Sequence, residues 1–409
     1  MSKNAINWIA PVMLVFFLLG VGQKASHVYY KDNLVRLSAL LVLIVVTGYI
    51  WQCFTVPEAL LGDSIAKRYI TAFCLFVVVA YGMNVTPKVS PFLLLISAGV
   101  GLFVHLTTLS TDIWVAAWQG ERVDLGLKNA QHAGVVFGVA LLASMFFLPR
   151  VSLLPFRARM LALPLLGCFI LLMIFGVIAT QTRAVWLGLA FSAVILPLFF
   201  AVILLIWRRS VHWRALAHAA AIGTGILLLA SMMLYSMVGS ITQRLSEETV
   251  DATTITKMAR SETISNSSIG VRIGLWSVAC EWIAERPVFG WGRRAASKLI
   301  KQSPHFNEEF KKKYTHVHNS YLETIVGVGA AAIACMIAII LLVAWRTTVL
   351  WRRREMPTDV FFFSCAVFSF WIIVNIFESY VILNFGTFLN TVIGGFVYSW
   401  YLRRKRETS

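Results

Sequence analysis

The sequence predicts an all-α polytopic membrane protein, and three observations support this fold class. Of its 409 residues, 58% are hydrophobic and only 13% are charged, whereas soluble globular domains carry about 25% charged residues. The mean hydropathy is +0.76. Apolar runs recur at about 20 residues, the length that a helix needs to cross about 30 Å of hydrocarbon. Because backbone groups inside a bilayer must be satisfied internally, we expect these runs to be helices.

Eleven apolar segments are predicted as membrane spans, and a missed span near the N-terminus would make twelve. The bundle is therefore expected to contain 11–12 transmembrane helices. In chain order the predicted spans are Ile6–Gly22, Leu34–Phe54, Tyr69–Val85, Pro91–Thr108, Ala133–Leu148, Met160–Thr180, Val185–Trp207, Leu216–Met237, Glu323–Trp345, Val360–Tyr380 and Thr387–Leu402.

Basic residues gather at four places, which fixes the expected orientation. Loops rich in Lys and Arg stay in the cytoplasm, so the net charge of +17 indicates topology and not nucleic-acid binding. The segment Ser110–Gln131, the turn Gln181–Arg183 and the long loop Gly239–Leu322 then share the opposite face. The basic clusters are Arg150 with Arg157 and Arg159, Arg208 with Arg209 and Arg214, Arg346 with Arg352 to Arg354, and Arg403 to Arg406.

The predicted domain organisation follows from this topology. Residues 1–238 form the N-terminal transmembrane helices, residues 239–322 form a large extracytoplasmic loop subdomain, and residues 323–409 form the last spans and a basic cytoplasmic tail. A connection as long as the middle segment is usually functional. The chemistry is therefore expected in this loop and in the turns that share its face.

One part of the long loop is predicted to be an amphipathic helix. From Val271 to Arg286, apolar residues recur at helical spacing, and Pro287 with the G-W-G of Gly290–Gly292 ends the pattern. The residues expected on its apolar face are Ile273, Trp276, Ala279, Cys280 and Ile283. We expect this helix to lie on the membrane or on the bundle of spans.

Two arginines on the extracytoplasmic face are candidate anion ligands. Arg183 closes the hairpin A-T-Q-T-R-A beside Gln181, which adds hydrogen-bond capacity. Arg272 follows the serines of S-N-S-S-I-G at the start of the amphipathic helix, where backbone N–H groups and a guanidinium suit a phosphate or pyrophosphate. The structural alternatives are an interfacial anchor for Arg183 and a solvated helix residue for Arg272.

His318 is the strongest candidate for a catalytic base. It lies in T-H-V-H-N-S-Y-L-E, where the chain returns to the bilayer. Histidine titrates near neutrality and can take a proton from a hydroxyl. Asn319 could orient His318 or the substrate, Tyr321 could contact a sugar ring, and His316 is the alternative base. A structural histidine at a helix start is the competing interpretation.

Several motif classes are missing from the sequence. There is no P-loop, no G-x-S-x-G, no H-E-x-x-H and no C-x-x-C, so NTPase, serine hydrolase and zinc chemistry have no support. The loops also lack an Asp-x-Asp pair of the kind that binds a metal with a nucleotide sugar. We therefore predict chemistry without a metal or another cofactor.

Four motifs together resemble the bacterial O-antigen ligase family. They are T-Q-T-R-A at Thr180–Ala184, G-V-R-I-G-L-W at Gly270–Trp276, R-P-V-F-G-W-G at Arg286–Gly292 and H-V-H-N at His316–Asn319. The similarity extends from the N-A-Q-H-A-G of residues 129–134 to the C-terminus. The family pattern H-[NSQ]-x9-G-xx-[GTY] is met at His318, Asn319 and Gly329, but its last position is Ala332.

This resemblance implies a GT-C-like fold and glycan transfer at the periplasmic face of the bacterial inner membrane. The donor would be a glycan on undecaprenyl diphosphate, and the acceptor would be lipid A–core oligosaccharide. Arg183 and Arg272 would bind the diphosphate, and His318 would activate the acceptor hydroxyl. Attack opposite the leaving diphosphate would invert the anomeric configuration.

Other functions remain open at this point. An O-antigen polymerase or a protein O-oligosaccharyltransferase would use the same donor. A transporter of lipid-linked sugars is the alternative from another class, and it would need ionisable residues along a path through the midplane. The predicted spans are almost free of such residues, with Glu378 as the main exception.

Overall fold

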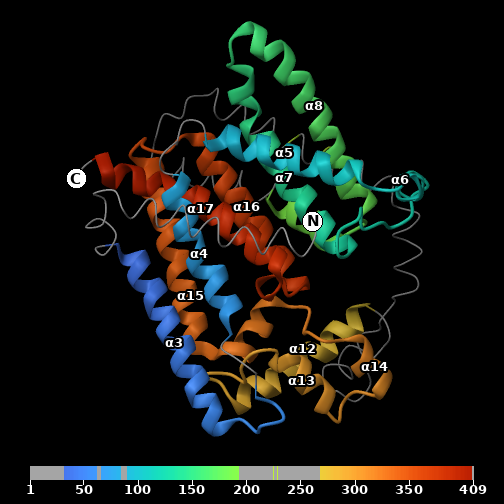
Figure 1. Ribbon diagram of the computed structural model, residues 1–409, viewed down its shortest axis with the longest axis vertical. Helices are drawn as coiled ribbons and strands as arrows, with labels where there is room; N and C mark the ends of the chain where they lie inside the picture. Colours follow the sequence, from blue (N-terminus) through green and yellow to red (C-terminus); the bar gives the residue numbers. More distant parts are fainter. Residues whose placement is uncertain are drawn as a thin grey trace. The chain divides into compact units, whose positions relative to one another are not determined.

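The computed structural model describes residues 32–61, 66–83, 90–192 and 268–407, with the isolated positions 224 and 228. Within these ranges the chain is helical and forms no strand (Figure 1). Five described helices are long and apolar enough to cross a membrane, or six if one bent pair is a single span. The all-α polytopic prediction is confirmed. The predicted spans Ile6–Gly22 and Leu216–Met237 lie outside the described residues, as does Val185–Trp207 beyond residue 192.

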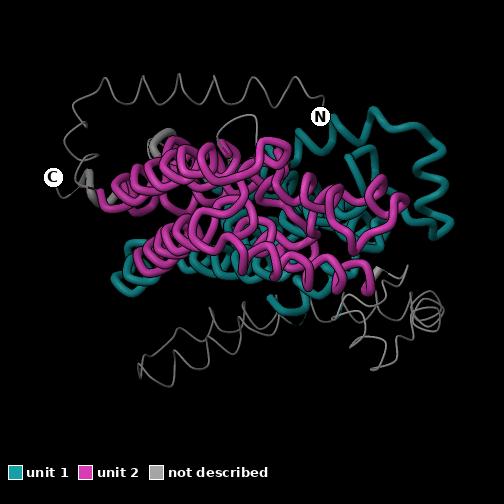
Figure 2. Tube along the Cα trace, turned by 90° about the horizontal axis from the view of Figure 1, so that it is seen from below, with its two compact units in different colours: residues 1–8, 86–238, 348–374 teal, residues 9–85, 239–347, 375–409 magenta. Residues whose placement is uncertain are grey.

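The chain divides into two compact units, each built from separate stretches of sequence (Figure 2). Unit 1 comprises Met1–Trp8, Thr86–Val238 and Thr348–Val374, and unit 2 comprises Ile9–Val85, Gly239–Thr347 and Asn375–Ser409. The predicted division at residues 238 and 322 concerns membrane topology, and it stays a prediction.

Unit 1 contains α5 (Ser90–Thr107), α6 (Thr111–Trp118), α7 (Ala130–Ser152), α8 (Phe156–Ala179) and most of α16 (Thr358–Phe377). The chain turns by 102° between α5 and α6, so the predicted span Pro91–Thr108 is followed by a sharply bent segment. Residues 183–192 are helical as well.

Small residues and one ion pair join the helices of unit 1. A Cβ on Gly138 or Gly188 would come within 3.0 Å of the Phe370 ring, so these glycines let α7 and the helical residues 183–192 approach α16 closely. Arg150 donates from Nη2 to Asp359 Oδ1 at 2.9 Å. The core of unit 1 is therefore close-packed and needs glycine where an aromatic ring of α16 enters.

Unit 2 contains a bundle of α3 (Asn33–Thr55), α4 (Lys67–Met83), α15 (Ser320–Arg352) and α17 (Asn384–Glu407). One apolar core joins the four helices, with members such as Leu41, Phe76, Met336 and Tyr398. Figure 1 shows α3, α4 and α15 side by side. Glycines of α17 again permit close contact, because a Cβ on Gly395 would lie 2.5 Å from the Val79 side chain.

A second apolar core in unit 2 gathers α12 (Ser268–Glu285), α13 (Ala295–Gln302) and α14 (Glu308–Lys313) (Figure 1). The predicted helix is confirmed as α12, which ends before Pro287, but α12 is not clearly amphipathic. Its predicted apolar face is wrong in part: Cys280 is exposed, and Ile273 is only partly buried. Both sides of α12 are apolar at helical spacing, so packing decides which side is covered. The buried residues are Val271, Leu275, Val278, Ala279 and Trp282.

Gly329 interrupts α15 with φ 73° and ψ 177°. A Cβ there would lie 2.1 Å from the carbonyl oxygen of Val288, so only glycine fits. The R-P-V-F-G-W-G segment replaces the helical hydrogen bonds lost at this break. The replacing bonds run from Trp291 N to Val326 O at 2.8 Å, from Gly292 N to Gly327 O at 2.9 Å, from Ala330 N to Pro287 O at 2.8 Å and from Ala331 N to Val288 O at 3.2 Å.

Two sequence motifs are thereby joined into one structural feature. A break inside an apolar helix is tolerated where other protein groups satisfy the freed backbone, and this segment does so directly. Ala332, the position that departs from the family pattern, is fully buried in the bundle core. The break lies on α15, the helix whose first turn follows His318 and Asn319.

Candidate functional site

A buried carboxylate joins the two predicted histidines of unit 2. Glu378 Oε1 lies 2.8 Å from His316 Nε2, and Glu378 Oε2 lies 3.3 Å from His318 Nδ1. The two imidazole centroids are 4.0 Å apart. The Glu378 side chain is only 4% exposed, against 26% for His316 and 19% for His318. Both histidine side chains are thus partly exposed, and the carboxylate between them is buried.

The backbone at His318 is held in an unusual conformation. Its φ is 55°, in the left-handed region that costs a non-glycine residue about 1–3 kcal/mol. The surrounding hydrogen bonds hold it there. Asn319 Oδ1 accepts from Tyr321 N at 3.0 Å and from Leu322 N at 3.2 Å, which caps the start of α15. Glu323 Oε2 accepts from Val317 N at 2.7 Å.

Two serines fix the segment that carries Glu378. Ser320 donates from its hydroxyl to the carbonyl oxygen of Glu378 at 2.9 Å, and Ser379 N donates to Glu378 Oε1 at 2.8 Å. The first residue of α15 is therefore bonded to the segment that follows α16. These two bonds help to fix the position of the carboxylate relative to the imidazoles.

The environment favours a neutral imidazole beside an ionised carboxylate. Burial lowers the pKa of His318 below its ordinary 6.5, and the electrostatic effects of His316 and Arg272 add to this, while the hydrogen bond to Glu378 and its negative charge oppose it. Burial alone would raise the pKa of Glu378, but hydrogen bonds from His316 and His318 outweigh it and lower the pKa well below 4.5.

These states define the proton positions on the ring of His318. An ionised carboxylate can only accept hydrogen bonds, so Nδ1 of His318 carries the proton that points at Glu378. Its Nε2 then holds a lone pair, and it makes no hydrogen bond with any residue in the described part of the chain. That is the arrangement of a general base awaiting a hydroxyl.

Arg272 is near this cluster, as the sequence predicted. It lies in the second turn of α12. Its charge adds to the lowering of the His318 pKa by burial, and it opposes the rise that burial causes in the pKa of Tyr380. Tyr314 packs its ring edge against His318 with centroids 6.0 Å apart. Tyr321 is 41% exposed in the first turn of α15. Binding of a diphosphate by Arg272 and contact of a sugar ring with Tyr321 stay predictions.

Arg183 and Gln181 belong to unit 1, so the structure describes their surroundings apart from the histidines. Arg183 is exposed at the start of the helical residues 183–192. The turn before it is held firmly: Gln181 Nε2 donates to Gly120 O at 2.6 Å, and the buried Thr182 hydroxyl donates to Ala130 O at 3.1 Å. These amide and hydroxyl groups position the turn that presents Arg183.

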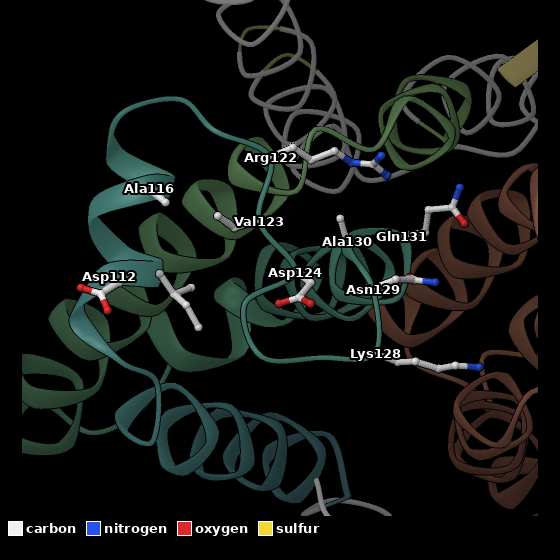
Figure 3. A pocket seen from close by; sticks show the side chains of 10 residues that line it. Asp112, Ala116, Arg122, Val123, Asp124, Lys128, Asn129, Ala130 and Gln131 are labelled. Carbon is white, nitrogen blue, oxygen red and sulfur yellow. The ribbon is translucent and has the colours of Figure 1, made fainter. Parts of the chain in front are cut away.

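A polar pocket of about 720 Å³ adjoins the same turn in unit 1. Arg122, one of its lining residues, donates from Nε to Thr180 O at 3.2 Å. Figure 3 shows Asp112 on α6, and Asp124 and Lys128 on the loop before α7. Part of this lining is structural, since Asp124 accepts from Gly126 N and Asn129 from His132 N. The pocket is therefore linked to the turn before Arg183 by hydrogen bonds of two lining residues, Arg122 and Ala130.

Glu378 is the member of this cluster that the sequence did not predict as a site residue. The prediction placed it inside the span Val360–Tyr380, but α16 ends at Phe377, so Glu378 is the first residue after the helix. The sequence feature that could have indicated a site residue is its position as an isolated acid at the end of an apolar segment. Nothing in the local sequence relates this acid to the two histidines.

His316, His318 and Glu378 each offer one ligand atom, and these atoms lie within 4.8 Å of one another. Such a spacing suits a metal ion, but the short contacts are also those of hydrogen bonds between imidazole N–H groups and a carboxylate. The prediction of chemistry without a metal is not tested by this geometry.

Comparison with known proteins gives a family for the central part of the chain. Residues 168–337 match the family model described as O-antigen ligase. The match includes Arg183, Arg272 and the H-V-H-N segment, and it ends before Glu378. A search of curated proteins finds no match.

Proposed function

Since the chain carries an O-antigen ligase family domain at residues 168–337, we propose that it is an O-antigen ligase. It transfers a glycan from undecaprenyl diphosphate to the lipid A–core oligosaccharide, without a metal and with inversion. The reaction occurs at the periplasmic face of the bacterial inner membrane. O-antigen ligase and polymerase-type function in a multi-pass membrane protein is what the family match and the apolar helices support in general.

One observation carries the assignment to glycosyl transfer by base catalysis. His318 presents a lone pair at Nε2, has its pKa lowered by burial, and is held by a buried carboxylate in a strained backbone conformation. A positioned base contributes about 10²–10⁴ in rate to transfer of a hydroxyl proton. This arrangement supports base catalysis because the unprotonated ring nitrogen can take the proton of an acceptor hydroxyl.

The proposed step balances without a co-reactant. The acceptor hydroxyl loses its proton to His318 Nε2, and its oxygen forms a bond to the anomeric carbon of the donor. The bond from that carbon to the phosphate oxygen breaks, and undecaprenyl diphosphate leaves with the electron pair. Arg272 and Arg183 would stabilise the departing charge, since hydrogen bonds to charged groups contribute roughly 1.5–3 kcal/mol each.

A purified-component assay tests this proposal. The wild-type protein is reconstituted with undecaprenyl-diphosphate-linked glycan and lipid A–core oligosaccharide, with and without chelator. We expect a lipid A–core product of higher mass, an inverted anomeric linkage and no effect of the chelator. A retained anomeric configuration would exclude the direct displacement.

Two further arms separate the rival functions. A polymerase would join donor glycans into longer chains when the lipid A–core acceptor is left out, and a protein O-oligosaccharyltransferase would glycosylate an added polypeptide instead. Movement of the donor across proteoliposomes without any glycan transfer would indicate a transporter. Each of these outcomes would replace the ligase assignment.

A further inference from the structure

We propose that Glu378 is a positioning residue that orients His318 and compensates the charge that His318 acquires when it takes the acceptor proton. This inference rests on the proposed function. Glu378 lies outside the residues that match the O-antigen ligase family model, and no sequence motif pointed to it. The juxtaposition of its carboxylate with both histidines carries the argument.

The first step concerns orientation. A neutral histidine can carry its proton on either ring nitrogen, and the hydrogen bond at one nitrogen selects the tautomer. Glu378 Oε2 faces His318 Nδ1 at 3.3 Å, so the proton is kept at Nδ1 and the lone pair at Nε2. Without the carboxylate, the wrong tautomer would direct N–H toward the acceptor hydroxyl.

The second step concerns the rigidity of the carboxylate itself. Its other oxygen, Oε1, accepts from His316 Nε2 at 2.8 Å and from Ser379 N at 2.8 Å, and the Glu378 carbonyl accepts from the Ser320 hydroxyl. His316 is therefore interpreted as a support for Glu378 and not as the base. A side chain fixed at both oxygens cannot turn away when the imidazole changes its charge.

The third step concerns charge. When His318 Nε2 takes the acceptor proton, the ring becomes an imidazolium within 3.3 Å of an anionic oxygen. The charged groups that act on this ring from the described elements are Glu378, which favours the cation, and His316 and Arg272, which oppose it. Glu378 is thus the one of these three groups that stabilises the protonated ring, and its loss leaves only the two groups that oppose protonation.

The test compares Glu378→Gln and Glu378→Asp in the purified transfer assay, with kcat, KM and the pH–rate profile as readouts. For Glu378→Gln we expect kcat to fall about 10- to 100-fold, since a hydrogen bond to a charged group is lost, with KM for the donor unchanged. The acid limb of the profile should move to lower pH, because removal of the carboxylate charge lowers the pKa of His318 further.

Glu378→Asp keeps the charge, so its acid limb should stay near that of the wild type even where its rate is reduced. The matched control is Glu281→Gln on α12, an exposed glutamate paired with His305 at 3.4 Å, which should behave as the wild type. A purely structural role of Glu378 would reduce the yield of active protein without moving the limb, and that result would overturn the inference.

Two other results would also overturn it, and they differ from failure of the proposed function. If Glu378→Gln keeps full activity and the acid limb of its pH–rate profile lies at the wild-type pH, the carboxylate does not act on the base. Loss of wild-type activity in chelator, restored by a divalent metal, would mean that the three side chains bind an ion. If the wild type itself transfers no glycan, the proposed function fails instead.

Discussion

Two regions of the molecule present predicted site residues in opposite ways. In unit 2, His318 is largely covered and rests on a carboxylate that is 4% exposed. In unit 1, Arg183 is exposed, and the turn behind it carries the hydrogen bonds. Both regions use a non-glycine residue with positive φ, His318 at 55° and Gln181 at 44°. Each region is thus fixed in its backbone, but only one has a buried functional group.

The difference matches the chemistry that each region is proposed to perform. A base must have a controlled pKa, and burial beside chosen charges provides that control. A guanidinium stays charged at every relevant pH. It therefore needs a fixed backbone and access to the ligand, but no burial to adjust its pKa. Changes in the histidine region should therefore act on the rate and its pH dependence, whereas changes at the arginine turn should act on donor binding.

Replacement of His318 should give the largest effect. His318→Ala removes the base, so transfer should fall by about 10²–10⁴-fold at unchanged protein level. His316→Gln keeps a donor for Glu378 and should retain far more activity. Initial rates of glycan transfer by the purified variants measure both. Equal losses in the two variants would contradict the assignment of separate roles.

Gly329→Ala should give the next largest effect, on stability. Alanine is strained at φ 73° and ψ 177° and would place its Cβ 2.1 Å from Val288 O, which we expect to cost about 3 kcal/mol or more. Thermal unfolding of the detergent-purified protein measures this. Gly167→Ala is the matched control, because a Cβ there meets nothing within 4 Å. Equal melting temperatures for the two variants would contradict the role of the break.

Arg183→Ala should weaken donor use about 10- to 100-fold in kcat/KM through loss of a charged hydrogen bond. Because the side chain is exposed, the melting temperature should not change. Arg183→Lys should recover part of the loss, since the charge remains without the planar fork. The exposed Arg157→Ala serves as control. A loss confined to the acceptor KM would place Arg183 away from the donor.

Substitution at Gln181 should give the smallest effect. Gln181→Gly removes the strain of the positive φ but also removes the hydrogen bond to Gly120 O. Each effect changes the free energy of unfolding by about 1 kcal/mol, and because their signs are opposite they nearly cancel. Gln181→Ala loses the bond without relief, so it should melt at a lower temperature than Gln181→Gly. The reverse order would mean that the turn is not strained.

The sequence predicted the elements of this molecule better than their contacts. Hydropathy located the described spans, because burial in lipid demands long apolar runs regardless of neighbours. It could not choose the covered face of α12, where both sides are apolar and packing against α13 decides. Nor could it foresee that Gly329 breaks α15, because that conformation depends on hydrogen bonds from residues 287–292.

The candidate site was predictable in part for the same reason. His318 and Arg272 stand in recognisable local motifs, and unit 2 brings them within electrostatic reach of each other. Glu378 is 60 residues from His318 in the chain, and no periodicity relates the two. Asn319 was predicted to orient the base or the substrate, and in the structure its side chain caps α15, a role common for asparagine before a helix.

The pH dependence of kcat/KM tests the central claim most directly, namely that a neutral, buried His318 is the base. Its pKa is lowered from 6.5 by burial, so the protein should stay active as the pH falls below 6.5 and lose activity only in a single acid limb beneath that value. The account predicts that this limb disappears from the residual activity of His318→Ala. A limb above pH 6.5, or the same limb in that variant, would contradict it.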